Sequence, residues 1–197
     1  MFSISSTTPL VLASASPRRK ELLEALGISL AVCPSSFDEE WNEGELPVDG
    51  VVRFARCKAL DVATRNPSSV VLGADTIVVV DGVILEKPKD KEDALRMLQM
   101  LSGRTHSVFG GVAILGIKRG LDRTFLSETK VTFSSVPENL LRHYVASGEP
   151  LDKAGAYGIQ GLAQVFVESV QGSYSNVVGL DTAKTVELLM SEDIISL

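Results

Sequence analysis

The sequence predicts a mixed α/β fold in which strands are joined both by hairpins and by helical crossovers. Apolar residues recur at helical spacing between Pro47 and Thr64, which predicts a long amphipathic helix. The β-branched run Val70 to Val80 predicts a strand, and Asp81-Gly82 then predicts a tight hairpin into Val83 to Leu85. Hairpins and crossovers therefore both occur, unlike the regular βαβ alternation of a Rossmann fold.

The elements before this helix are short. Pro9 to Ala13 is an apolar run typical of a buried strand. Pro17 to Leu26 is predicted to be helical, since a proline suits the first helical position and Gly27 suits the end. A second apolar run covers Leu30 to Cys33, and an acidic loop covers Phe37 to Glu45.

The elements after the hairpin follow from the same signals. The run Lys91 to Leu101 has helical spacing that turns Leu95 and Leu98 inward. The remaining predictions are strands at about 105–117 and 124–133, a helix from Pro137 to Ser147, a glycine-rich loop from Gly155 to Gly161, a strand at 165–170 and a last helix near 181–191. No repeat or linker divides the chain, so we expect one domain over residues 1–197, with room for two lobes.

Composition narrows the classes of function. With 197 residues, 45% of them hydrophobic and 22% charged, the chain can bury a core without disulfides. A net charge of −6 argues against nucleic acid as a partner, so cations for an anionic substrate must be local. Cys33 and Cys57 lack metal-site spacing and fit a reducing compartment. The first residues lack a cationic leader and no apolar stretch could span a membrane, so we expect a cytoplasmic protein.

The segment Ser14-Ala15-Ser16-Pro17-Arg18-Arg19 is the first candidate site. Ser16 suits the N-cap of the helix that Pro17 opens. Cations are disfavoured in a first helical turn unless an anion lies beside them, so Arg18 and Arg19 indicate a phosphate site. Alternatively, the two arginines pair with the acidic loop or face water.

Asp75 is the second candidate. A carboxylate in a strand without other charges is costly to bury unless it is paired or binds a cation. In a regular strand, Thr76 would point to the opposite face. The alternative is an aspartate at a strand end that caps a turn.

Three charged segments are weaker candidates. The run Asp38-Glu39-Glu40 offers the oxygen ligands that Mg²⁺ prefers, although such a run is more often a solvated loop. Lys58 falls on the apolar stripe of its helix, where it either extends its ammonium to the edge, the favoured interpretation, or reaches into a cleft. Glu86-Lys87 is a charged loop stiffened by Pro88.

Other chemistries lack their motifs. The glycine-rich nucleotide-binding patterns and the nucleophile pattern G-x-S-x-G are absent from the sequence. His106 and His143 are the only histidines, so a histidine-rich metal site cannot be built. A Ser-His-Asp triad would need one of these two residues.

Together these segments resemble the Maf family of nucleotide pyrophosphatases. The matching stretches follow the family's order over nearly the full length. They are LASASPRRKELLEALGI, FDEE, RFARCKA, LGADTIVVVDGVILEKPKD, ALRMLQMLSGRTHSVFGGVAI, and YVASGEPLDKAGAYGIQG through GSYSNVVGL.

The resemblance implies an inosine triphosphatase-like (Maf/Ham) fold, with a bent mixed β-sheet flanked by helices and two lobes around a central cleft. It implies hydrolysis of nucleoside triphosphates to monophosphate and pyrophosphate, a divalent metal (Mg²⁺ or Mn²⁺) and a homodimer. It also implies house-cleaning of nucleotide pools, with a possible link to division arrest. The alternatives are a nucleotide-binding regulator and a nucleotidyltransferase.

The resemblance also implies roles for individual residues. Asp75 is expected to be the general base, Glu39 and Glu86 to lie with it near the metal, and Lys58 and Lys87 to bind phosphate together with Ser14 and Arg18. Arg18-Arg19, Asp75-Thr76 and Gln160 resemble the branch that prefers dTTP and UTP, whereas the 7-methyl-GTP branch carries a Trp in the SPRR motif and a Gln after the aspartate.

Two positions depart from the family pattern. Cys57 stands where an acidic residue commonly precedes the lysine. Asp181 replaces a proline and can still cap the last helix.

Overall fold

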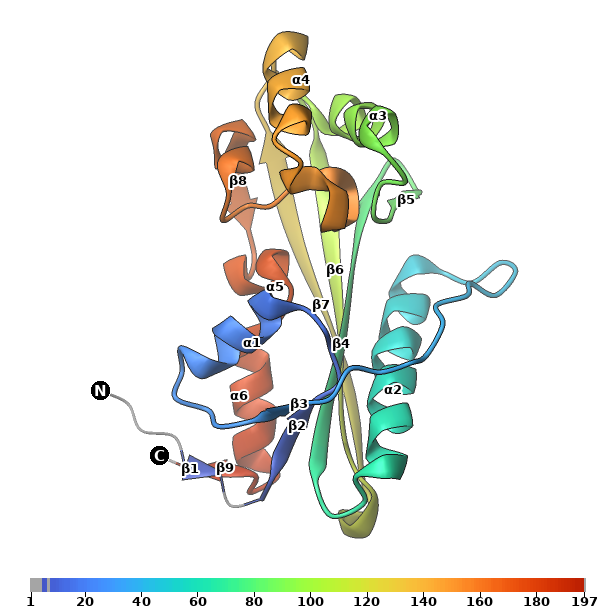
Figure 1. Ribbon diagram of the computed structural model, residues 1–197, viewed down its shortest axis with the longest axis vertical. Helices are drawn as coiled ribbons and strands as arrows, with labels where there is room; N and C mark the ends of the chain where they lie inside the picture. The colour runs from blue at the N-terminus through green and yellow to red at the C-terminus, as the bar shows by residue number, and fades with distance from the viewer. Residues whose placement is uncertain (1–4, 7, 197) are drawn as a thin grey trace. The chain divides into compact units, whose positions relative to one another are not determined.

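The computed structural model describes residues 5–6 and 8–196 (Figure 1). Its strands are β1 (Ser5–Ser6), β2 (Leu10–Leu12), β3 (Ala31–Val32), β4 (Val70–Val80), β5 (Val83–Leu85), β6 (Thr105–Gly116), β7 (Leu121–Phe133), β8 (Val167–Gln171) and β9 (Ile195–Ser196). Its α-helices are α1 (Pro17–Glu24), α2 (Pro47–Arg65), α3 (Lys91–Leu101), α4 (Glu138–Ala146), α5 (Tyr174–Val178) and α6 (Thr182–Ser191). Its 3-10 helices are η1 (Ile117–Arg119), η2 (Glu149–Asp152), η3 (Ala154–Ala156) and η4 (Leu162–Phe166).

The chain forms two compact units. Unit 1 comprises Met1–Asp75, Gly110–Ser127 and Gly179–Leu197, and unit 2 comprises Thr76–Phe109 and Glu128–Val178. The strands β4, β6 and β7 each contribute residues to both units. A single domain over residues 1–197 stays a prediction.

Unit 1 contains a mixed sheet with the strand order β3-β2-β4-β6-β7. The short strand β2 runs parallel to both neighbours, with Leu12 opposite Val32 in β3 and Leu72 in β4. Neighbouring residues of β2 and β4 alternate between two core clusters, as the pleat of a strand requires. Alanines of α2 pack into one cluster, and residues of α1 and α6 pack into the other, on opposite sides of these strands (Figure 1).

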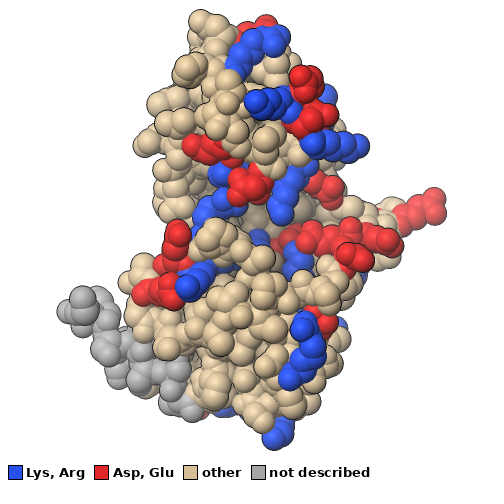
Figure 2. Space-filling model, viewed as in Figure 1, with Lys and Arg blue, Asp and Glu red and all other residues tan. Residues whose placement is uncertain are grey.

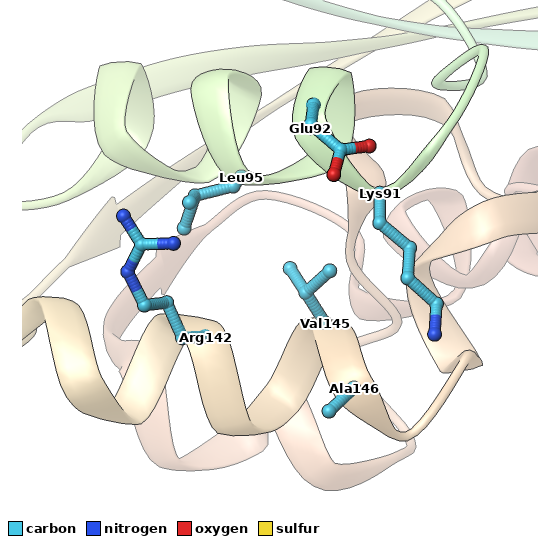
Figure 3. Close-up of a pocket in the computed structure, with 6 residues that line it drawn as sticks. All are labelled: Lys91, Glu92, Leu95, Arg142, Val145 and Ala146. Atoms are coloured by element: carbon cyan, nitrogen blue, oxygen red, sulfur yellow. The ribbon is translucent and has the colours of Figure 1, made fainter.

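Unit 2 is built on hairpins and two packed helices. β5 pairs antiparallel with β4, and the connecting residues Asp81 and Gly82 both have positive φ angles, of 48° and 78°. This is the tight hairpin that the sequence predicts. β8 pairs antiparallel with β7. Helices α3 and α4 form a small pocket lined by Lys91, Glu92, Leu95, Arg142, Val145 and Ala146 (Figure 3).

The structure confirms a mixed α/β fold with an open sheet flanked by helices. Two strand starts were wrong. The strand predicted at 165–170 begins at Val167, because η4 occupies the residues before it, and the strand predicted at about 124–133 already begins at Leu121, soon after η1. The glycine-rich loop 155–161 also starts within η3, which the sequence did not indicate.

Other features went unpredicted, among them one strand pair and one short helix. The β1-β9 pair joins segments near the two chain ends, and α5 is a single short turn. Residues 1–4 and 7, part of the N-terminal segment analysed for a leader, lie outside the described residues. Among the residues that are described, no helix is both long and apolar enough to cross a bilayer.

Candidate active site

Glycines bring helix α2 directly onto the sheet of unit 1. A Cβ atom added at Gly73 of β4 would lie 2.3 Å from the Ala55 carbonyl oxygen and 2.8 Å from the Ala59 backbone nitrogen. A Cβ added at Gly111 of β6 would lie 2.3 Å from the Val51 carbonyl oxygen. Only glycine permits so close an approach of helix and strand backbones. Asp75 follows Gly73 by two residues and so faces the same side of β4, toward α2.

Lys58 of α2 meets Asp75 at this contact. Its Nζ lies 2.6 Å from Asp75 Oδ1 and 2.5 Å from Glu39 Oε1, so one ammonium joins two carboxylates. The Lys58 side chain is only 12% exposed, and the interpretation that it extends to the helix edge is therefore wrong. Asp75 lies in the middle of β4, so the alternative of an aspartate at a strand end that caps a turn is also wrong.

The acidic loop reaches Lys58 from the other side. The Glu39 side chain is 47% exposed, and Asp38, Glu40 and Glu43 are exposed as well. Acidic side chains accordingly gather along this loop (Figure 2). The loop is nevertheless more than a solvated run, because Glu39 has a specific cationic partner.

The Ser14–Arg19 segment lies in the same unit. Ser16 and Pro17 take the predicted N-cap and first helical positions of α1, although the Ser16 side chain makes no capping hydrogen bond in the described part of the chain. Ser14 is buried, and its Oγ accepts hydrogen bonds from Ser16 N at 3.2 Å and from Arg19 Nη1 at 3.0 Å. A hydroxyl and a guanidinium thus lie together beside a helix N-terminus, a combination that suits an anion.

A distant carbonyl fixes Arg19 from behind. Its Nε donates a hydrogen bond of 2.9 Å to the Gly179 carbonyl oxygen. Burial lowers the pKa of Arg19, and the negative charges of Asp75 and Glu39 partly oppose this effect. The two carboxylates that Lys58 joins therefore act electrostatically on the Arg19 guanidinium. Arg18 is half-buried in the same helix, and its charge also lowers the pKa of Arg19.

Unit 1 offers a partial set of metal ligands. Asp75 and Glu39 present oxygens within hydrogen-bond distance of one nitrogen, so both could reach a common cation. Among the described residues, no group of three or more His, Cys, Asp or Glu side chains is arranged to hold a metal ion. This donor set fits Mg²⁺ or Mn²⁺, which take one or two carboxylates and complete their shell with substrate phosphate oxygens and water.

The other predicted residues lie in unit 2. Glu86 and Lys87 are exposed and follow β5, and the Glu86 carbonyl oxygen accepts a 3.1 Å hydrogen bond from Gly155 N. The charged loop and the start of the glycine-rich loop are thus neighbours. Thr76 is half-buried in β4, and Gln160 is exposed in the glycine-rich loop.

A buried tyrosine and a glutamate hold the chain on both sides of Gln160. Tyr144 Oη donates to Glu149 Oε1 at 3.0 Å and accepts from Gly158 N at 3.2 Å. Glu149 Oε2 accepts from Leu162 N at 3.1 Å. Burial raises the pKa of Tyr144, so its hydroxyl remains a donor to this carboxylate.

Some partners were missing from the sequence-based site. Gly179 entered the sequence-based site only as part of the GSYSNVVGL stretch. Its φ is 141°, a conformation that favours glycine, so the glycine itself was a signal of an unusual backbone at this position. Asp181 does cap α6 as expected, since its Oδ1 accepts from Lys184 N at 3.3 Å. Asp61 and Arg53, which anchor the acidic loop, were not considered as part of the site at all.

Comparison with known proteins gives a consistent result. The family model described as Maf-like protein matches residues 9–192. Relatives named dTTP/UTP pyrophosphatase from Bacillus pumilus and Desulfotalea psychrophila are each 49% identical; the first alignment covers 91% of this chain and 94% of the relative, the second 96% and 97%. A human relative named probable bifunctional dTTP/UTP pyrophosphatase/methyltransferase protein is 52% identical over 86% of this chain and 30% of its own length. The chain therefore belongs to the Maf family.

Proposed function

We propose that this protein hydrolyses dTTP and UTP to the nucleoside monophosphate and pyrophosphate. The observation that carries the proposal is the Lys58 ammonium held between Asp75 and Glu39, two carboxylates that also act electrostatically on Arg19 of the Ser14–Arg19 segment. Near full-length relatives named dTTP/UTP pyrophosphatase support the reaction and the substrate class.

Asp75 is proposed to orient and deprotonate the water that attacks the α-phosphorus. Its side chain is 9% exposed and is held by a charged hydrogen bond, so its orientation is fixed before substrate arrives. A divalent cation held by Asp75 and Glu39 would lower the pKa of that water and neutralise phosphate charge. Glu86, which belongs to unit 2, stays a predicted metal ligand. Asp75→Asn should keep the fold and lose at least about 100-fold in kcat.

Cationic side chains are proposed to bind the triphosphate. Arg18 and Arg19 would offer guanidinium groups, and Ser14 a hydroxyl, to phosphate oxygens at the start of α1. Lys58 would offset the charge that develops on the leaving pyrophosphate. Lys87, which belongs to unit 2, stays a predicted phosphate ligand. Proton transfer and charge neutralisation are thereby divided between different side chains.

Thr76 and Gln160 are proposed to read the base. A glutamine amide carries both a donor and an acceptor, which matches the mixed edge of a pyrimidine. The hydrogen bonds of Tyr144 and Glu149 support this assignment, because they restrain the backbone on either side of Gln160.

The remaining proposals concern the working state of the protein. Mg²⁺ or Mn²⁺ is the proposed cofactor, a homodimer the proposed assembly and the cytoplasm the proposed location. The free thiols Cys33 and Cys57 support a reducing compartment. The proposed role is the removal of surplus or modified pyrimidine triphosphates from the nucleotide pool. A link to division arrest is proposed as well. Light scattering tests the dimer, and chelation followed by metal addition tests the cofactor.

The deciding experiment measures pyrophosphate release with Mg²⁺ from dTTP, UTP, CTP, dATP, GTP and 7-methyl-GTP. Selective turnover of dTTP and UTP is expected. Selective turnover of 7-methyl-GTP would keep the chemistry and overturn the base assignment. Tight binding without turnover would favour a nucleotide-binding regulator, and a nucleotide conjugate in place of free monophosphate would indicate a nucleotidyltransferase.

A further inference from the structure

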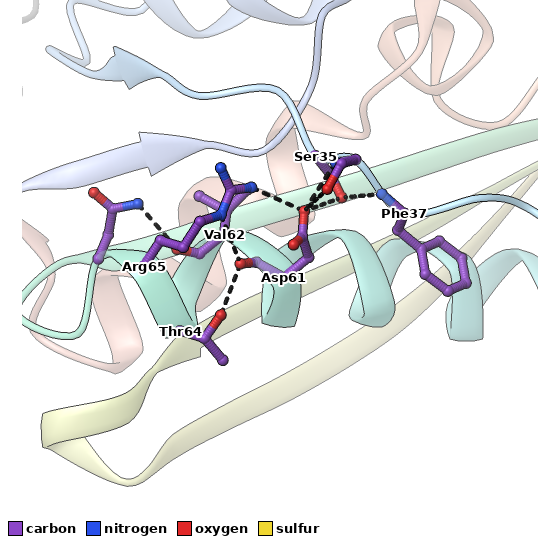
Figure 4. A network of polar contacts seen from close by, with 8 residues as sticks. Ser35, Phe37, Asp61, Val62, Thr64 and Arg65 are labelled. Carbon is purple, nitrogen blue, oxygen red and sulfur yellow. Dashed lines mark hydrogen bonds and ion pairs between the residues drawn. The ribbon is translucent and has the colours of Figure 1, made fainter.

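Asp61 of α2 holds the segment that leads into the acidic loop (Figure 4). Its Oδ2 accepts hydrogen bonds from Ser35 Oγ at 2.8 Å and from Ser36 N at 2.9 Å, with Ser36 Oγ at 3.4 Å. Ser35 Oγ in turn accepts from Phe37 N at 3.0 Å. These hydrogen bonds lower the pKa of Asp61, so the carboxylate stays charged and keeps accepting them near neutral pH.

Arg65 orients the Asp61 carboxylate from the next turn of the helix. Its Nη2 lies 2.9 Å from Asp61 Oδ2. Asp61 follows Lys58 by about one helical turn, so the loop anchor and the proposed phosphate-binding lysine share one stretch of α2.

The far side of Glu39 is held by the same helix. Arg53 Nη2 donates a 2.8 Å hydrogen bond to the Glu40 carbonyl oxygen, and its Nε lies 2.6 Å from Glu45 Oε1. The Trp41 ring packs edge-on against Phe54, with centroids 4.9 Å apart, and covers Gly50, where an added Cβ would lie 2.1 Å from a ring carbon. Glu39 therefore lies between two anchors that both belong to α2.

We propose that Asp61 is a positioning residue that acts through Glu39. By fixing Ser35 and Ser36 to α2, it presents the Glu39 carboxylate to Lys58 and restricts the loop to one arrangement before substrate binds. The Glu39 side chain is exposed and is held in the described chain by its ion pair with Lys58, so its placement depends on how its backbone is held. This inference rests on the proposed function, since Glu39 matters to catalysis only if the pyrophosphatase reaction occurs.

A double-mutant cycle tests the proposal. Asp61→Ala in the wild-type background should lower kcat for dTTP about tenfold with little change in KM, because a mispositioned loop weakens the reacting arrangement more than binding. In a Glu39→Ala background the same change should cost less than about twofold, since residues that act through one another are not additive. Hydrogen exchange at the Ser36 amide should rise in Asp61→Ala.

Asp122→Ala is the matched control. It removes a carboxylate from an ion pair with Arg56 of the same helix, and its kcat should stay near wild type. Asp61→Asn, which keeps an acceptor oxygen of similar shape, should recover part of the loss and guards against a folding defect in the alanine variant.

The outcomes separate the two claims. Equal losses from Asp61→Ala in both backgrounds, or no loss in the wild-type background, would overturn the role of Asp61 while leaving the pyrophosphatase intact. Absence of pyrophosphate release from the wild-type protein would overturn the proposed function, and the role of Asp61 with it.

Discussion

Gly73→Ala should weaken both the fold of unit 1 and its proposed chemistry. The new methyl group would lie 2.3 Å from the Ala55 carbonyl oxygen and 2.9 Å from the Ala59 Cβ. Heavy atoms pack best at about 3.5–4.0 Å, so α2 or β4 must move by about 1 Å. The nearest atoms belong to the helix backbone and the short Ala59 side chain, so no rotamer change relieves the clash.

The expected magnitude follows from two opposing effects. Overpacking a well-filled core costs about 1–3 kcal/mol. Losing a glycine from the unfolded chain returns about 0.4–1 kcal/mol where the backbone conformation suits alanine. A net loss of about 1–2 kcal/mol in the free energy of unfolding is therefore expected. A displacement of about 1 Å between Lys58 and Asp75 should also lower kcat/KM by about 10- to 100-fold.

Urea denaturation and pyrophosphate release measure the two effects. Gly116→Ala is the matched control, because it lies in β6 of the same unit and its added Cβ would meet nothing closer than 3.5 Å. Its stability should lie within about 0.5 kcal/mol of wild type. If Gly73→Ala proved as stable and as active as Gly116→Ala, the argument from close backbone approach would be refuted.

Three further predictions test other parts of the site and core. Lys58→Met should leave the buried Asp75 carboxylate without its lysine partner, at a cost on the order of 1–3 kcal/mol in the free energy of unfolding. This cost is below the usual range for a broken buried ion pair because the second carboxylate, Glu39, is half exposed. Denaturation of Lys58→Met and Lys58→Arg measures the difference, and equal stability of the two variants would contradict the prediction. Burial lowers the pKa of His106 from 6.5 to about 4, so the folded chain binds this proton less readily than the unfolded chain. The free energy of unfolding should therefore fall by about 3 kcal/mol as pH drops from about 6.5 to 4, and His106→Phe, compared with wild type across this range, should lose that component; parallel pH curves would show that the histidine contributes nothing. Gln160→Ala should reduce the preference for UTP over CTP by about tenfold with less effect on thermal stability, and an unchanged ratio of kcat/KM values would remove Gln160 from base recognition.

Local sequence patterns determined much of the fold. The Asp81-Gly82 turn, the helix begun by Pro47 and the long strand Val70–Val80 depend on neighbouring residues, and each occurs where its pattern predicts it. Periodicity reports such near neighbours reliably, because the backbone conformation of a turn, helix or strand fixes which of them share a face. The same reasoning identified Asp75 as a charge that needs a partner.

The tertiary structure decided what those residues contact. The sequence favoured an edge position for Lys58, yet the glycine at position 73 brings α2 so near the sheet that the ammonium meets two carboxylates. The partner of Arg19 is a carbonyl far away in sequence, and the anchor of the acidic loop is Asp61, a residue with no distinctive pattern. Such contacts depend on packing between distant segments, which the spacing of residues along one chain segment does not encode.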